Sequence, residues 1–224
     1  MNPLISVIIP VYNPNFSQLM EAIGSILNQT VTDFEIIIVD DGSDNGFNLN
    51  QIRINDTRII KLGYSFNQGI SNALNTGIKH ARGIYIARMD SDDVALLNRF
   101  ELQLPIVKKH GIISSNIIII DDQGKAIGKS RKFPFHNIIR RIQLYSLRLN
   151  PVNHPTIIGK KEIFDEYLYN PDFDGVEDFE LWLRMSNKYK IYFDSNFVLY
   201  YRQSTRYKER KVLHNAVAKK KFKL

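Results

Sequence analysis

The stretch NQGISNALNTGIKHARGIYIARMDSDD, residues 67 to 93, contains a helix pattern, a strand pattern and a cluster of acids in succession. Residues 69–81 repeat apolar side chains at helical spacing, and residues 83–90 form a short apolar run typical of a strand. The strand runs into three carboxylates, Asp90, Asp92 and Asp93. Crowded carboxylates repel one another, which raises their pKa values unless a cation or hydrogen-bond donors offset the repulsion. The stretch therefore predicts either a cation site or a solvated acidic loop.

The same alternation extends towards the N-terminus. Apolar runs that predict strands are followed by polar breaks, and helical patterns lie between them; the strands cover residues 5–12, 34–40 and 58–62, and a helix covers 16–29. Alternating strands and helices predict an α/β fold with a Rossmann-like, mostly parallel sheet and helices on both faces. Ligands of such sheets bind at the carboxyl ends of the strands. We expect three strand ends to meet at one site, namely Pro10–Asn13, Asp40 with Asp41, and Asp90–Asp93.

The second half of the chain contains predicted helices and strands that do not alternate regularly. Its patterns predict a helix at 96–110, two strands about a Gly turn at 111–130, an amphipathic helix at 136–149, a helix at 175–189 and closing strands at 190–194 and 197–202. No linker or repeat separates the halves, so they are expected to be lobes of one domain. We place the first lobe at residues 1–95, the second at 96–205 and a basic tail at 206–224.

Composition excludes several classes of protein. The 224 residues are 44% hydrophobic and contain no cysteine, which rules out a disulfide scaffold, thiolate metal sites and a cysteine nucleophile. No apolar run reaches the ~18 residues of a membrane span, and the first residues lack a signal-peptide pattern. A cytoplasmic protein is expected.

The net charge of +7 is concentrated at the C-terminus. Residues 201–224 contain nine Lys or Arg and one Glu, a balance of +8, so the other 200 residues sum to about −1. This distribution argues against a nucleic-acid partner for the globular body. The tail also contains Val212, Leu213 and Val217 between its basic residues, a pattern of helices that lie on anionic membranes, although a solvated terminus is the alternative.

Spacing excludes other nucleotide and metal sites. No G-x-G-x-x-G follows a strand, and Gly124–Ser130 has three residues between its glycines where a phosphate-binding loop needs four. That segment is interpreted as a turn. The histidines lack the helical pairing of a zinc protease, and only His154 is kept as a candidate.

The acids have two interpretations. In an extended chain Asp90 and Asp92 share a face, whereas Asp93 points away. Mg²⁺ and Mn²⁺ favour one or two carboxylates together with substrate phosphates, so the pair suits a metal-bound diphosphate. Asp is also a favoured N-cap, and Asp93 is expected to cap a helix that begins at Val94.

At this point the ordered motifs resemble a known family. SVIIPVYN, IIIVDDGSDN, the opening stretch, NHPT and EDFELWLRM are similar to the successive signatures of family-2 glycosyltransferases, inverting enzymes of GT-A fold that use nucleotide-diphosphate sugars. The resemblance covers about the first 205 residues, and the ordered set is more specific than any single motif.

The resemblance implies roles for individual residues. It places Pro10, Tyr12 and Asn13 by the nucleobase and ribose, gives Asp40 a hydrogen bond from the base, and lets Gly69 and Asn72 set the nearby loop. Asp90 would contact the ribose or metal, and Asp92 would ligate the metal. Asp178, rather than Glu177, would be the catalytic base, unless both acids only complement the helix dipole. His154 would lie in an acceptor-side loop or be a structural histidine. Arg202 would clamp the diphosphate, although Gln203 stands where relatives often carry histidine.

We therefore expect a metal-dependent inverting glycosyltransferase that uses Mn²⁺ or Mg²⁺. Its expected donor is a UDP-sugar, and its acceptor is a saccharide or lipid-linked saccharide in cell-surface polysaccharide or lipooligosaccharide synthesis. The basic tail could hold the enzyme peripherally on the inner face of the membrane. Two alternatives stay open: a noncatalytic nucleotide-sugar-binding protein, and a sugar-nucleotide pyrophosphorylase, which would need a Gly-rich loop and a basic residue after the first strand.

Overall fold

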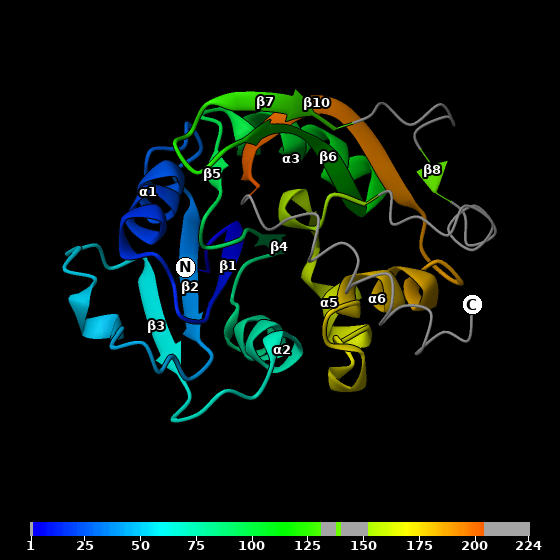
Figure 1. Ribbon diagram of the computed structural model, residues 1–224. Helices are drawn as coiled ribbons and strands as arrows, with labels where there is room; N and C mark the ends of the chain where they lie inside the picture. Colours follow the sequence, from blue (N-terminus) through cyan, green and yellow to red (C-terminus); the bar gives the residue numbers. More distant parts are fainter. Residues whose placement is uncertain (1, 131–137, 140–151, 204–224) are drawn as a thin grey trace.

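A single curled sheet runs through the part of the chain described by the computed structural model, residues 2–130, 138–139 and 152–203 (Figure 1). Its path is β3-β2-β1-β4-β9-β6-β10-β5, with β7 beside β6 and β8 beside β10. The strands are β1 (Ile5–Val11), β2 (Phe34–Asp40), β3 (Ile59–Gly63), β4 (Tyr85–Arg88), β5 (Val94–Ala95), β6 (Ile112–Ile120), β7 (Ala126–Lys129), β8 (Ile138–Ile139), β9 (Ile158–Lys160) and β10 (Ile191–Arg202).

Strands β1 to β4 form the parallel half that the sequence predicts. β1 pairs in parallel with β2 and β4, and β2 pairs in parallel with β3. Because β2 and β3 lie on one side of β1 while β4 lies on the other, the strand order reverses at β1. Open α/β sheets bind ligands at such a reversal, outside the carboxyl ends of the strands. The ends of β1 and β4 are therefore where a site is expected.

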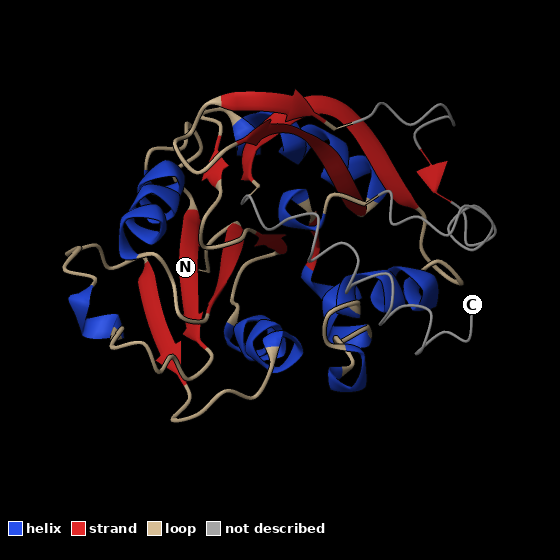
Figure 2. Ribbon diagram, in the orientation of Figure 1, coloured by secondary structure: helices blue, strands red, loops and turns tan. Residues whose placement is uncertain are grey.

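Helices cover both faces of the sheet (Figure 2). On one face, alternate β1 residues such as Val7 and Ile9 share a core with helices α1 (Phe16–Leu27) and α3 (Arg99–His110). On the other face, Ile8 shares a core with α2 (Ile70–His80), α5 (Lys161–Glu166) and α6 (Glu177–Met185). Burial on alternate sides follows from the two-residue period of a strand. The predicted helices on both faces are confirmed.

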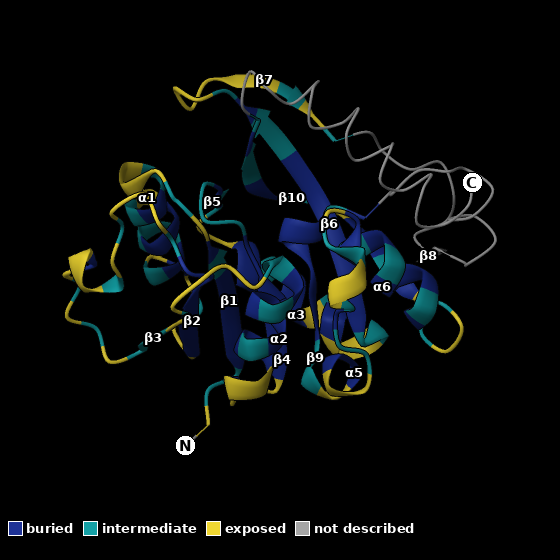
Figure 3. Cartoon of the chain, turned by 60° about the horizontal axis from the view of Figure 1, so that its bottom comes forward, coloured by how far each residue is buried: buried dark blue, intermediate teal, exposed yellow. Residues whose placement is uncertain are grey.

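The second half is mixed, as expected. β9 lies antiparallel between β4 and β6, and β6 runs parallel to β10. β6 and β7 form the predicted pair of strands about a Gly turn, and Gly124–Ser130, predicted to be a turn, begins in that turn and continues as β7. The two predicted closing strands are one strand, β10, whose register shifts between Phe193 and Phe197. Strands β1, β2, β4 and β6 are buried along most of their length (Figure 3).

Two helix predictions need correction. The chain does not become helical at Val94: residues 94–95 form β5 against β10, and α3 begins at Arg99. The prediction that Asp93 caps a helix is therefore wrong, because its carboxylate instead accepts a hydrogen bond from the backbone N–H of Arg202 (2.9 Å). The predicted helix at 136–149 is wrong at 138–139, which form β8 beside β10, and the rest of it lies outside the described residues.

Among the described residues, none of the helices combines the length and apolar character that crossing a bilayer requires. The basic tail at 206–224 lies outside the described residues.

Candidate functional site

The end of β1 presents the first three predicted donor-site residues. The Ile8 carbonyl accepts a hydrogen bond from the N–H of Met89, the residue just beyond β4 (3.2 Å). The backbone nitrogen of Pro10, two residues later, faces the same side of β1, at a point where β4 has already ended. Its missing N–H therefore costs the sheet no hydrogen bond. Tyr12 follows with 47% of its surface exposed, an aromatic ring available to a ligand.

Asn13 holds the loop that follows β2. It adopts a left-handed conformation (φ 49°), which Asn tolerates better than most residues. Its Nδ2 donates to Asp44 (2.7 Å), while its Oδ1 accepts from the backbone N–H groups of Asp44 and Asn45 (2.9 and 3.1 Å). Asp40 is buried at the end of β2 and accepts from the Ser43 hydroxyl (2.7 Å). Asn13 and Asp40 thus fix the shape of one loop beside the β1 end.

Asp41 has a role that the sequence did not assign. Its carboxylate accepts from Asn67 Nδ2 (3.0 Å) and from the backbone N–H groups of Gln68 (2.8 Å) and Gly69 (3.0 Å). Burial raises the pKa of Asp41, and the nearby charges of Asp174 and Asp40 raise it further. Asp41 thus joins the end of β2 to the start of α2, where Gly69 is the N-cap and Asn72 Nδ2 donates to the Gln68 carbonyl (2.7 Å).

Arg88, the last residue of β4, was missed by sequence reasoning. It is buried, and its guanidinium forms a two-nitrogen ion pair with the Asp90 carboxylate, one contact measuring 2.7 Å. Burial is the largest single effect and lowers the pKa of Arg88, but the charge of Asp90, the hydrogen bond to it and the charges of Tyr169 and Asp93 together hold the pKa above its ordinary range. The only signal in the sequence was a lone basic residue inside an apolar strand, two positions before an acid.

Asp92 and Asp93 complete the acidic loop. Burial, followed by the charge of Asp90, raises the pKa of Asp92 to about 6. Asp93 is fully buried; the same two effects, with the charge of Asp92, raise its pKa well above the ordinary range. Its Oδ2 has no hydrogen-bond partner among the described residues. The loop therefore carries more negative charge than its protein donors offset.

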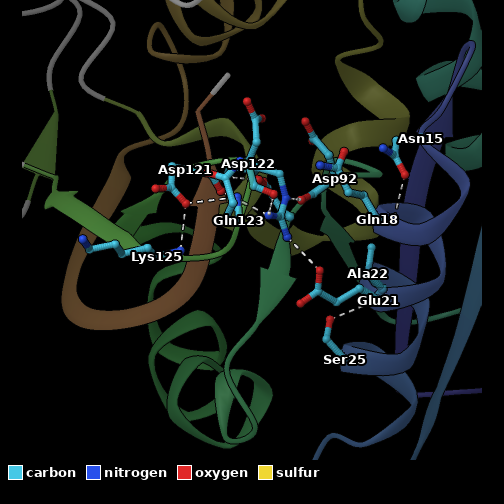
Figure 4. Close-up of polar contacts among 12 residues, drawn as sticks. Asn15, Gln18, Glu21, Ala22, Ser25, Asp92, Asp121, Asp122, Gln123 and Lys125 are labelled. Atoms are coloured by element: carbon cyan, nitrogen blue, oxygen red, sulfur yellow. Dashed lines mark hydrogen bonds and ion pairs between the residues drawn. The ribbon is translucent and has the colours of Figure 1, made fainter. Parts of the chain in front are cut away.

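Arg202 is surrounded by protein acceptors. Its Nε donates to the Asp92 carbonyl (2.9 Å), one terminal nitrogen donates to the carbonyls of Asp121 and Asp122 (3.2 Å each), and the other pairs with Glu21 of α1 (2.7 Å). Glu21, Asp92, Asp121 and Asp122 gather in one place (Figure 4). The side chain joins α1, the acidic loop and the β6–β7 turn. Its predicted contact with a diphosphate stays a prediction.

The residues at the β4 end fit a divalent cation bound together with a substrate. Among the described residues, no group of three or more His, Cys, Asp or Glu could hold a metal ion. Asp90 and Asp92 supply hard carboxylate oxygens, and two such ligands with substrate phosphates suit Mg²⁺ or Mn²⁺. Burial and then the charge of Asp90 raise the pKa of Asp92, and a bound cation would offset the second of these effects.

Two acids open α6, and their surroundings differ. Glu177 is buried and accepts from the Gly175 N–H (2.8 Å); burial, then the charge of Asp178, raises its pKa to about 7. Asp178 is partly exposed and accepts from the Phe179 N–H (2.6 Å). Asp178 is thus the more accessible of the two acids.

His154 lies behind these acids. Its Nε2 shares a 2.7 Å hydrogen bond with the Tyr169 hydroxyl, and its ring meets Trp182 of α6 edge-on. Burial, assisted by the charge of Arg88, lowers the pKa of His154 well below its usual range, so the ring is neutral. The structure places His154 in a buried contact between α6 and the loop at 152–157.

Arg88 is the charge that the two halves of the site share. Its positive charge acts on the pKa of Asp92, Glu177, Tyr169 and His154. The acidic loop after β4 and the acids of α6, predicted from motifs more than eighty residues apart, are therefore neighbours in the fold. One site with two sets of carboxylates results.

Known proteins resemble this chain in sequence and in fold. It is 37% identical over 191 residues to an uncharacterised glycosyltransferase of Rickettsia conorii, covering 84% of this chain and 31% of that protein. It is 29% identical over 188 residues to an Escherichia coli protein named UDP-Glc:alpha-D-GlcNAc-diphosphoundecaprenol beta-1,3-glucosyltransferase WfgD, covering 80% of this chain and 68% of that protein. The chain spans about a quarter to a third of the length of the relatives from Rickettsia conorii, Rickettsia bellii and Rickettsia felis.

A crystal structure of S. aureus TarS, residues 1–349, superposes with a TM-score of 0.68 at 19% identity, over 98% of this chain and 66% of that chain. Further TarS structures contain UDP or UDP-GlcNAc. The predicted fold class is thereby confirmed. Residues 6–168 match the family described as Glycosyl transferase family 2. With that match over most of its length, the chain belongs to glycosyl transferase family 2.

Proposed function

We propose that the chain carries the catalytic domain of an inverting glycosyltransferase that moves a sugar from a UDP-sugar to a saccharide or lipid-linked saccharide in cell-surface polysaccharide or lipooligosaccharide synthesis. The observation that carries the proposal is the meeting of the Asp90–Asp92 loop with the acids of α6 around Arg88. The UDP and UDP-GlcNAc complexes of TarS support the donor class. The name of WfgD supports a lipid-diphosphate acceptor.

The donor would lie across the ends of β1 and β4. Tyr12 would stack on the base, since its ring is half exposed beside the loop that Asn13 and Asp40 hold. Asp90 and Asp92 would hold Mn²⁺ or Mg²⁺ against the diphosphate. That cation would offset the charge that builds on the diphosphate as it leaves.

Asp178 would act as the base. In a single displacement, the acceptor oxygen forms a bond to the anomeric carbon while the bond from that carbon to the diphosphate oxygen breaks. Asp178 takes the proton of the acceptor hydroxyl, and the configuration at the anomeric carbon inverts. Its partial exposure supports this assignment over buried Glu177, which would hold the Gly175 turn at the start of α6.

Replacing Asp178 by Asn tests the proposal. The amide keeps size and hydrogen bonding but cannot take a proton, so turnover should fall about 10²- to 10⁴-fold while UDP affinity changes little. UDP release with candidate donors gives the rate, calorimetry gives the affinity, and Glu177→Gln is the matched control. An α-linked donor should give a β-linked product. Unchanged turnover in Asp178→Asn, or a retained α linkage, would refute the mechanism.

The noncatalytic alternative makes a different prediction. A nucleotide-sugar-binding protein would bind UDP-sugars without releasing UDP by transfer or slow hydrolysis. The pyrophosphorylase alternative is less favoured, because PVYNPN, residues 10–15 at the end of β1, provides neither a Gly-rich loop nor a basic residue.

A further inference from the structure

The segment that leads into α6 lies along one polar edge of α2. Asn75 of α2 is buried, and its side chain forms a reciprocal pair with the backbone of Tyr169: Nδ2 donates to the carbonyl and Oδ1 accepts from the N–H, both at 2.9 Å. One turn earlier, the Ser71 hydroxyl reaches the Asn170 carbonyl (3.4 Å). A short 3-10 turn, η3 (Pro171–Phe173), continues this contact with α2.

Asp174 closes the contact at the N-terminus of α2. Its Oδ1 accepts from the Ser71 backbone N–H (3.1 Å) and from the Ser71 hydroxyl. The first N–H groups of a helix have no partner within the helix, so a carboxylate there satisfies a donor and complements the helix dipole. The N-cap residue Gly69 makes no side-chain cap of its own. The cap of α2 therefore comes from a residue 103 positions later in the chain.

Gly69 is shaped for this contact. Its φ of +93° suits glycine, and a Cβ at this position would overlap Asp174 Oδ2. The absence of a side chain at residue 69 thus leaves space for the Asp174 carboxylate. On its other side, the same loop is held by Asp41 through the N–H of Gly69 (3.0 Å). Two carboxylates, one from each half of the chain, thus hold a single loop.

We infer that Asp174 is a positioning residue that ties the start of α2, on the donor side of the site, to the start of α6, which carries Asp178. Only three residues separate Asp174 from Asp178, and Gly175 between them donates its N–H to Glu177 (2.8 Å). A shift at Asp174 is therefore transmitted to the α6 acids over a very short path. The consequence for transfer rests on the proposed role of Asp178, whereas the tie between the helices does not.

Hydrogen exchange of the 224-residue chain tests the tie directly. Asp174→Ala should raise amide exchange about tenfold both at residues 69–73 and at residues 175–179, because the loss of the cap frees both helix starts. Asp174→Asn should restore protection, since the amide oxygen still accepts from Ser71. Gly69→Ala should reproduce the Asp174→Ala pattern from the other side. Gly124→Ala is its control, with a similar φ of +81° and open space at its Cβ position.

The outcomes distinguish a failure of the inferred tie through Asp174 from a failure of the proposed function. Faster exchange confined to residues 69–73 in Asp174→Ala would overturn the inference, as would a lack of rescue by Asn. With UDP-glucose and UDP-GlcNAc as donors, Asp174→Ala should lower kcat for UDP release about tenfold with little change in KM. A wild-type chain that releases no UDP from either donor counts against the proposed function, while the exchange result alone decides the inference.

Discussion

At the scale of single residues, Glu177 and Asp178 are adjacent in the sequence, but the Glu177 side chain is buried and the Asp178 side chain is partly exposed. Burial and the charge of Asp178 raise the pKa of Glu177 from 4.5 to about 7. Between these values the native state holds a proton that the unfolded chain has lost, so stability falls as pH rises through this window. The stabilisation that the neutral Glu177 carboxyl provides is fully present below pH 4.5 and absent above pH 7.

Glu177→Gln should remove this pH dependence. The amide carries no charge and still accepts from Gly175, so the variant should gain stability relative to wild type as pH rises from 4.5 to 7. The difference should grow by on the order of 2–3 kcal/mol, at 1.36 kcal/mol per pKa unit. Urea unfolding of both proteins at several pH values measures it. A difference that is constant with pH would mean that Glu177 titrates normally.

Arg202 offers a second prediction at this scale. Arg202→Met should lower the free energy of unfolding by about 2–4 kcal/mol, because the carbonyls of Asp92, Asp121 and Asp122 lose a buried donor. Arg58→Met, which removes a surface pair with Asp56, is the control and should cost less. Unchanged unfolding together with weaker UDP binding would instead support the diphosphate contact that the sequence predicted.

Two helical glycines make opposite predictions at the scale of elements. A Cβ at Gly77 of α2 would overlap the Ile8 side chain in the buried centre of the sheet, so Gly77→Ala should destabilise by about 1–3 kcal/mol. A Cβ at Gly24 of α1 meets nothing within 4 Å, so Gly24→Ala should stabilise by about 0.5–1 kcal/mol through helix propensity. Thermal unfolding compares them. Equal shifts of Tm would show that α2 does not depend on close packing over β1.

The elements that the sequence predicted are those with a clear period. β1 to β4, α1 and α2 have four to twelve residues of regular pattern, and each was placed correctly. β5 and β9 were missed because two or three residues carry no period, and they exist only through partners far away in the chain. For the same reason Arg88 and Asp174 escaped prediction, since their roles depend on contacts that no local pattern reveals.

At the scale of the whole molecule, the net positive charge is concentrated near the C-terminus. The eight Lys and Arg residues of the basic tail, 206–224, should bind anionic membranes, each contributing roughly 1 kcal/mol near the surface. We expect the chain to co-sediment with vesicles that contain acidic lipid at low salt and to be released at high salt. Neutral vesicles are the control. Salt-insensitive or absent binding would leave the tail as a solvated terminus and would remove the peripheral membrane location.

The position of β9 has a consequence for how the protein is made. β4 ends at residue 88, but its second neighbour, residues 158–160, emerges from the ribosome about seventy residues later. During that interval the nascent sheet has an open edge at β4, with unpaired backbone groups that can recruit another chain. A fragment that stops at residue 95 would keep this edge permanently, so it should aggregate during expression unless a chaperone covers it.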